Sequence, residues 1–304
     1  MRNKKRLTAM LLLLAFTSVL PGIAQQSQQS GKLEDPPWIK QVAPARVLYT
    51  VPNMEQVKVK RDVVYKRTAD VELKADIYSP ADSKSGARLP AVIFIHGGLL
   101  PPNLLTKPKE WGVYISYGQI AAASGFVGVT FNHRFYSWNN LGEPQSDVND
   151  LVAYVRNNAE SLGVDKDRII LWAFSGGTLL LSQSLRDAPP HIRCMISYYG
   201  VLDLQDLRKR IPATIADETL NPLSPLHALT NSKNKLPPML VARAGLDADL
   251  NGGVDRFVQA ALAKNATIDF SNHPVGQHGF DILDDNQRTR EIIKQTLEFI
   301  REHS

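Results

Sequence analysis

The sequence contains a single cysteine, Cys194, among its 304 residues. One thiol cannot form an internal disulfide, so an oxidising compartment would add no cross-link within this chain. Cys194 lies in an apolar run, 192–199, and a free cysteine in such a run is usually buried and inert. We therefore expect a core residue there and not a nucleophile.

The sequence also lacks the glycine fingerprint of dinucleotide-binding proteins and any spacing of His, Cys, Asp and Glu that is typical of metal sites. It shows no internal repeat, no low-complexity tract and no second domain. We therefore expect no cofactor and no metal ion, and nothing in the pattern specifies an oligomeric state.

The net charge is small once residues 1–24 are set aside. The formal net charge is +5, and removing the four basic and no acidic residues of 1–24 leaves +1. So small a charge provides no electrostatic footprint for nucleic acid or for an anionic membrane surface. We expect no nucleic-acid partner.

Residues 1–24 have the three parts of a secretory signal peptide. A basic start, 1–6, precedes an apolar run, 7–20, which is short for a membrane span. Small residues then lead to Ala24, after which we predict cleavage; an uncleaved anchor helix is the alternative. We expect a secreted or periplasmic protein without stable membrane insertion.

Residues 25–53 are polar and rich in proline, and we expect a linker or strap on the domain surface with Trp38 as an anchor. Residues 54–304 have a length that suits one domain. Two segments, 57–65 and 71–78, alternate apolar and polar residues and predict antiparallel edge strands. Continuous apolar runs predict buried strands at 90–96, 126–132, 168–174, 192–199 and 238–244, with a further strand at 267–270.

Segments of helical pattern separate these strands, at 112–124, 146–162, 176–185, 253–263 and 284–302. Repeated strand–helix pairs predict an α/β fold with a mostly parallel central sheet and helices on both faces. Residues 200–236 are irregular and punctuated by proline, and they predict a short cap insertion. Ligands on such sheets bind at the carboxyl ends of the strands, so the loops there are the candidate site.

An apolar strand pattern, 169–174, ends abruptly at Ser175 and is followed at once by a helical pattern. A strand that turns into a helix within a few residues requires small neighbours two positions before and after the turning residue. Ala173 and Gly177 meet that requirement. The stretch predicts a nucleophile elbow with Ser175 at its tip; a plain strand-to-helix turn is the alternative.

His96, Gly97 and Gly98 directly follow a predicted buried strand. Two successive glycines let backbone N–H groups point into a cleft without side chains in the way. We expect the Gly98 amide to pair with the Gly176 amide in an oxyanion hole, with Gly97 or Leu99 as a further donor. A plain strand-ending turn is the alternative, and His96 is expected to orient the loop.

Asp247 and Asp249 follow another predicted strand, where a carboxylate can accept the Nδ1–H of an imidazole and fix its tautomer. We favour Asp247; Asp249 and a simple Asx turn remain alternatives. Of the seven histidines, His278 combines a glycine-flanked loop at the right edge with the right chain order. The order Ser175, Asp247, His278 predicts a nucleophile, an orienting acid and a general base.

With these motifs, the region from about residue 57 to the end resembles an α/β-hydrolase. It is most similar to the secreted bacterial esterase and lipase group with a His-Gly-Gly oxyanion motif, some of whose members are acetyl-xylan or feruloyl esterases. The segment 272–281 is similar to that group's catalytic-histidine segment. Two positions depart from the group's pattern: Ala173, where the elbow usually begins with glycine, and Leu99, where a third glycine is usual.

The resemblance implies a serine carboxylic-ester hydrolase that works through an acyl-enzyme. A cap as short as 200–236 leaves an open, moderately apolar pocket, which favours short acyl chains or carbohydrate and aromatic alcohols. The expected substrate is a small-molecule or polysaccharide-linked ester, and aromatic residues such as Trp111 and Tyr114 are candidates to stack on a ring. Alternatives are a peptidase-like or dienelactone-hydrolase-like enzyme, or a binding protein without catalysis on the same fold.

Overall fold

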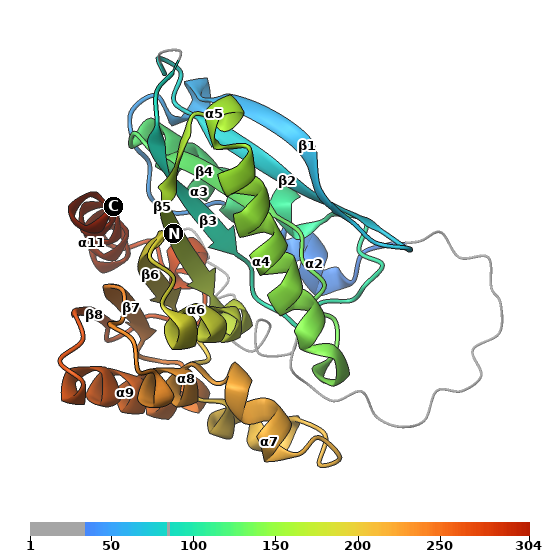
Figure 1. Ribbon diagram of the computed structural model, residues 1–304, viewed down its shortest axis with the longest axis vertical. Coiled ribbons are helices and arrows are strands. Elements are labelled where there is room, and N and C mark those ends of the chain that lie inside the picture. The colour runs from blue at the N-terminus through green and yellow to red at the C-terminus, as the bar shows by residue number, and fades with distance from the viewer. Residues whose placement is uncertain (1–33, 84–85) are drawn as a thin grey trace, which may run out of the picture.

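The computed structural model describes residues 34–83 and 86–304, so the predicted signal peptide, residues 1–24, lies outside the described residues. They form an α/β fold around an eight-stranded sheet of order β1-β2-β4-β3-β5-β6-β7-β8 (Figure 1). The strands are β1 (Lys58–Arg67), β2 (Glu72–Ser79), β3 (Leu89–Ile95), β4 (Val127–Phe131), β5 (Val164–Phe174), β6 (Ile192–Tyr198), β7 (Met239–Ala244) and β8 (Ile268–His273).

Strand direction changes only at one edge of this sheet. β2 pairs antiparallel with both β1 and β4, whereas all strands from β4 to β8 pair in parallel. Only two of the ten residues of β1 are buried, whereas six of the seven residues of β3 are buried. Alternating and continuous apolar patterns therefore separated the edge from the centre correctly, and the predicted fold class is confirmed.

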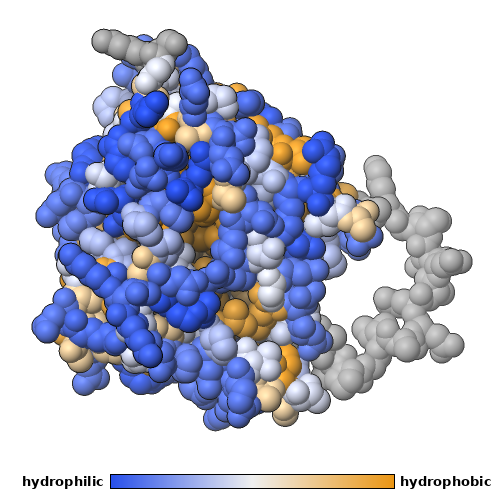
Figure 2. Space-filling model, viewed as in Figure 1, coloured by the Kyte–Doolittle hydropathy of each residue, from blue (hydrophilic) through white to orange (hydrophobic). Residues whose placement is uncertain are grey.

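Helices cover both faces of the sheet. One face carries α3 (Gly112–Ala123) and α11 (Gln287–His303); the other carries α4 (Gly142–Asn157), α6 (Ser182–Asp187), α8 (Pro225–Asn231) and α9 (Ala248–Ala263). The view that places α4 and α6 in front of the sheet shows a mostly hydrophilic surface (Figure 2). The apolar stripes of these helices therefore face the sheet.

The predicted helix 176–185 is instead a 3₁₀ helix, η5 (Ser175–Leu181), followed by α6. The Ser175 carbonyl oxygen, which would accept the first α-helical hydrogen bond, already has other donors. The Thr178 hydroxyl lies 2.7 Å from it and the Val201 amide 3.3 Å from it. Short 3₁₀ segments are frequent at the start of α-helices.

The predicted irregular insertion, 200–236, is largely helical, so that part of the expectation is wrong. It contains η6 (Leu204–Arg210), α7 (Asp217–Leu220), η7 (Asn221–Leu223) and α8. Pro222 and Pro225 each stand in the first turn of a short helix, where a missing N–H costs nothing. Prolines that we expected to prevent helix formation therefore stand at the start of short helices.

The expected surface strap is also different in the structure. Residues 34–53 contain α2 (Pro37–Val42) and η2 (Met54–Gln56) follows, while residues 25–33 are outside the described part. Ile39 is fully buried in the same core cluster as α3 and α11. The segment is thus an integral layer of the domain, which its polar and proline-rich composition concealed.

The other short helices are η3 (Pro108–Glu110), η4 (Trp138–Asn140), α5 (Ala159–Leu162) and α10 (Phe280–Leu283). Within the described ranges, no helix has both the length and the apolar character needed to cross a membrane. Cys194 is buried in β6, and burial raises the pKa of its thiol to about 12, which keeps the thiol protonated. The expectation of an inert core cysteine is confirmed.

Candidate active site

Ser175 stands at the tip of a sharp turn between β5 and η5. Its backbone φ is +52°, a left-handed value that is uncommon for a residue with a side chain. A Cβ at Gly177 would lie 2.4 Å from the carbonyl oxygen of His96, so this position requires glycine. Ala173 is fully buried inside β5. The local geometry is that of the predicted elbow.

The side chains of Ser175, His278 and Asp247 form one hydrogen-bonded chain. The Nε2 atom of His278 lies 2.8 Å from Ser175 Oγ, and its Nδ1 atom lies 2.5 Å from Asp247 Oδ2. Asp247 and His278 are both about 95% buried, at 3% and 5% exposure. Hydrogen bonding of Nδ1–H to the carboxylate leaves Nε2 free to accept the serine proton.

Asp249, the alternative acid, faces away from this chain. Its carboxylate forms an ion pair with Arg210, and its side chain is 48% exposed. The two aspartates lie near the start of α9, where successive side chains point in different directions. The structure therefore places Asp247, and not Asp249, against His278.

The two glycines after β3 lie directly beside the serine. A Cβ at Gly97 would come 3.1 Å from Ser175 Cβ, and a Cβ at Gly98 would come 2.3 Å from the Phe135 ring. A side chain at position 98 would thus force the ring or the loop to move, and one at position 97 would press on Ser175. Gly176 follows Ser175 in the first turn of η5, where the amides have no partner within the helix.

His96 fixes the orientation of this glycine loop. Its Nδ1 atom lies 2.6 Å from the Gly97 carbonyl oxygen, while its Nε2 accepts from the His133 amide at 3.4 Å. In a trans peptide the N–H points opposite to the C=O, so the Gly98 amide is turned away from His96. Burial lowers the pKa of His96 well below its usual value and that of His133 to about 3. Both rings are neutral supports and not bases.

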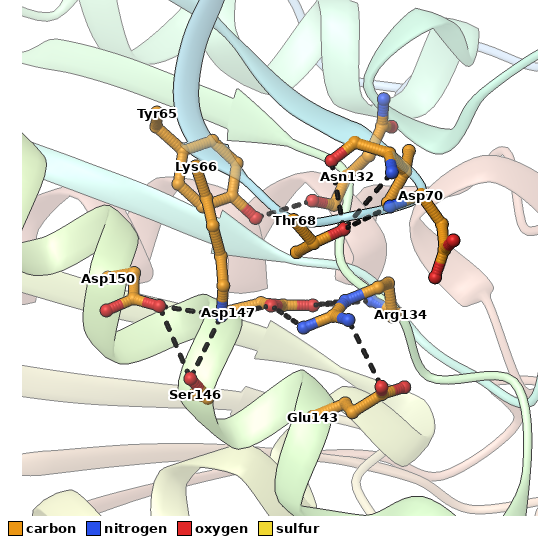
Figure 3. A network of polar contacts seen from close by, with 11 residues as sticks. Tyr65, Lys66, Thr68, Asp70, Asn132, Arg134, Glu143, Ser146, Asp147 and Asp150 are labelled. Carbon is orange, nitrogen blue, oxygen red and sulfur yellow. Dashed lines mark hydrogen bonds and ion pairs between the residues drawn. The ribbon is translucent and has the colours of Figure 1, made fainter.

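An ion-pair cluster around the buried Asp147 holds Arg134, the residue that follows His133 (Figure 3). Arg134 donates three hydrogen bonds to Asp147, at 3.0, 3.0 and 2.8 Å, and Lys66 adds a fourth at 2.8 Å. Asp147 is fully buried. The next residue, Phe135, accepts the Leu100 amide at 3.0 Å, which ties the glycine loop to the cluster.

Sequence reasoning missed the role of a further buried carboxylate near His278, that of Asp281. Its two oxygens accept hydrogen bonds from the hydroxyls of Tyr117, at 2.7 Å, and Tyr199, at 2.9 Å. The Tyr199 ring in turn packs against His278 with ring centroids 4.8 Å apart. Burial raises the pKa of Asp281 above its ordinary value, against the opposing effect of these hydrogen bonds. The available sequence signal was its position three residues after His278.

A small recess of about 70 Å³ opens beside Ser175 and His278. Trp38 and Val42 of α2 line it, together with Leu100, Trp111 and other residues around the glycine loop. No residue of the insertion 200–236 lines it: the apolar side chains of that insertion pack instead against Phe135 and Leu179 in a separate cluster. The pocket is therefore bounded by the N-terminal segment and not by the expected cap.

A larger hollow of about 440 Å³ lies elsewhere, beside Lys58, Ser79 and Leu162. These residues lie near the amino ends of the parallel strands, at the edge opposite to Ser175. Ligands on parallel sheets bind at the carboxyl edge, so we assign the site to the smaller recess. Across the described part of the chain, no group of three or more His, Cys, Asp or Glu side chains could hold a metal ion.

Comparison with known proteins gives a family match. The BD-FAE family model matches residues 75–243, a span that contains the glycine loop and Ser175 and ends before Asp247.

Two curated relatives match shorter parts of the chain. A probable isoprenylcysteine alpha-carbonyl methylesterase, ICMEL1, of Oryza sativa subsp. japonica is 29% identical over 136 residues, which are 43% of this chain and 30% of that protein. The non-reducing polyketide synthase Preu6 of Preussia isomera is 27% identical over 158 residues, 48% of this chain and 7% of that protein. The chain thus spans less than a third of the length of either relative.

Solved structures with the same fold include esterase 2 of Thermogutta terrifontis. Its propionate-bound form has a TM-score of 0.65 and 23% identity, covering 83% of this chain and 96% of that one. The butyrate-bound form has the same TM-score at 22% identity, covering 83% and 95%. At this level of identity the likeness concerns the fold.

Proposed function

The chain belongs to the BD-FAE family, an α/β-hydrolase esterase family, and we propose that it is a serine carboxylic-ester hydrolase with Ser175 as nucleophile. The observation that carries this proposal is the chain of hydrogen bonds from Ser175 through His278 to Asp247, at 2.8 and 2.5 Å. Such an arrangement activates a hydroxyl that is otherwise a weak nucleophile.

The proposed reaction begins when Ser175 Oγ attacks the acyl carbon and its proton passes to Nε2 of His278. Asp247 stabilises the imidazolium ion that forms. The oxyanion of the tetrahedral intermediate accepts hydrogen bonds from the Gly98 and Gly176 amides, with Gly97 beside them. The bond to the alcohol oxygen then breaks, and His278 returns the proton to the departing alcohol.

Water completes the cycle. His278 removes a proton from a water molecule, which attacks the acyl-enzyme and forms a second tetrahedral intermediate. That intermediate collapses as the bond between the acyl carbon and Ser175 Oγ breaks, and the serine regains its proton from His278. The products are a carboxylic acid and a free enzyme.

The size of the recess supports a short acyl group. Its volume of about 70 Å³ is roughly half that of a cavity of about 150 Å³ that holds benzene. Room for about three carbon atoms suits acetyl and propionyl groups, while longer acyl chains and a carbohydrate or aromatic alcohol must extend away from it. We propose small-molecule or polysaccharide-linked esters of short acids as substrates.

Hydrolysis of p-nitrophenyl acetate, butyrate and longer esters by the wild type and by Ser175→Ala tests this function. We expect turnover in the wild type and a loss of about 10⁴-fold or more in the variant. Ser182→Ala is a matched control, because Ser182 is a buried serine only seven residues away that donates to the Leu223 carbonyl at 2.8 Å. Equal rates in wild type and Ser175→Ala would contradict the proposal.

We also propose that the mature protein begins after Ala24 and is secreted or periplasmic. The support is the basic and then apolar pattern of residues 1–24. Expression of the full chain in a bacterium, followed by fractionation and N-terminal mass spectrometry, should yield a chain that begins at Gln25 outside the cytoplasm. An intact N-terminus in the cytoplasmic fraction would overturn this proposal.

A further inference from the structure

One wall of the recess comes from a segment far from every predicted catalytic residue in the sequence. Trp38 and Val42 stand one helical turn apart on α2 and line the same recess as Ser175. Residues four apart on a helix share one face, so α2 presents a two-residue apolar surface to the substrate position.

This wall is anchored at both ends. Before α2, the Asp35 carboxylate accepts the amides of Leu105, at 2.6 Å, and Thr106, at 2.9 Å. After α2, the Ala43 carbonyl accepts the Gly112 amide at 2.6 Å. A Cβ at Gly112 would lie 2.6 Å from the Ala45 carbonyl oxygen, so the two segments are in close backbone contact.

The other large side chains around the recess have their own restraints. Trp111 donates its indole N–H to the Thr106 carbonyl at 3.0 Å, and Tyr199 donates to Asp281. Phe174 is 2% exposed in the core. Trp38, by contrast, is only partly buried and packs edge-on against Trp111 at 6.5 Å. Trp38 and Ile282 are the partly buried apolar side chains of the lining, and Trp38 is the larger of the two.

We propose that Trp38 sets the upper limit on acyl chain length, with Val42 narrowing the same side of the recess. This inference rests on the proposed esterase function and names the residue that determines its acyl specificity. An acyl group too long for the recess would have to displace one of its walls. Trp38 is the largest partly buried side chain there, whereas Trp111 and Tyr199 are held by hydrogen bonds.

The test measures kcat/KM for p-nitrophenyl acetate, butyrate, hexanoate and octanoate in the wild type, Trp38→Ala and Trp38→Phe. We expect the octanoate-to-acetate ratio to rise by about tenfold or more in Trp38→Ala, and by much less in Trp38→Phe. A ratio of two substrates is insensitive to the fraction of enzyme that is folded.

Two further variants serve as a control and as the reverse change. Tyr49→Ala truncates a partly buried aromatic residue of the same segment and core cluster that does not line the recess, and it should leave the ratio unchanged. Val42→Phe should fill the recess and lower the butyrate-to-acetate ratio.

The outcomes separate the two proposals. An unchanged octanoate-to-acetate ratio in Trp38→Ala, or an equal rise in Tyr49→Ala, would overturn the role of Trp38 while Ser175-dependent turnover left the esterase function standing. Absence of any Ser175-dependent turnover in the wild type would overturn both.

Discussion

The close contact between Gly98 and Phe135 allows the role of the glycine loop to be tested by substituting these two residues, singly and together. An alanine Cβ at position 98 would lie 2.3 Å from Phe135 Cδ1, well inside van der Waals contact, and Phe135 is fully buried. Either the ring or the loop must move. Overpacking of this kind costs about 1–3 kcal/mol of stability, and displacing one oxyanion donor lowers kcat by roughly 10²–10³-fold.

Replacing Phe135 with alanine should relieve the clash between its ring and an alanine at position 98. Phe135→Ala alone should cost about 3–5 kcal/mol because it leaves a cavity in the core. In the double variant, the new methyl group at position 98 enters that space, so the two changes should couple favourably by about 1–3 kcal/mol. The double variant should also regain a large part of the kcat lost in Gly98→Ala.

The assay combines denaturant unfolding of all four proteins with kcat for p-nitrophenyl acetate. Gly97→Ala is the matched comparison, since its Cβ would meet Ser175 and not Phe135, and Phe135→Ala should not rescue it. A wild-type kcat in Gly98→Ala would show that the ring moves and the loop does not, whereas a kcat lost in Gly98→Ala and not regained in the double variant would refute the link between the ring and the loop. Strictly additive free energies in the double variant would refute the steric reasoning.

Three further predictions concern carboxylates. Asp247→Asn should lower kcat by roughly 10⁴-fold, whereas Asp249→Ala, at an exposed ion pair, should leave it within about threefold; the same ester assay distinguishes them. Because burial raises the pKa of Asp281, its folded form holds a proton more tightly than its unfolded form. The contribution of Asp281 to the free energy of unfolding must therefore fall as pH rises from the ordinary carboxyl pKa through the raised value. Asp281→Asn should remove this part of the pH dependence from unfolding curves measured across that range. Asp147→Ala should cost about 1–3 kcal/mol in denaturant unfolding, because it removes the buried acceptor of Arg134 and Lys66 while Glu143 and Asp150 still pair with them; no measurable loss would contradict the role of the cluster.

The local pattern of apolar and small residues was sufficient to predict the sheet and the loops in which the candidate residues lie. Strand burial follows from whether apolar residues alternate or run continuously, as in β1 and β3, and the parallel order follows from the intervening helices. The elbow was recognisable because close backbone contact at Gly177 demands glycine, and that demand is visible in the sequence.

What escaped prediction depends on contacts between distant segments. Nothing near Trp38 in the sequence indicates that it shares a recess with Ser175, and nothing near Asp281 indicates two tyrosine partners 164 and 82 residues away. Asp247 was already favoured from the sequence, but excluding Asp249 needed the direction of each side chain at the start of α9. These contacts depend on tertiary packing, which cannot be predicted from the periodicity of apolar residues in the sequence.

Covalent labelling of Ser175 is the most direct test of its proposed role as the nucleophile. The wild type and Ser175→Ala would each be treated with diethyl p-nitrophenyl phosphate, and p-nitrophenolate release would be compared with the mass of the intact protein and its peptides. We predict one phosphoryl group per molecule on the peptide that contains Ser175, loss of esterase activity in proportion, and no label in Ser175→Ala. Equal labelling of both proteins, or a label on another residue with activity lost, would contradict that role.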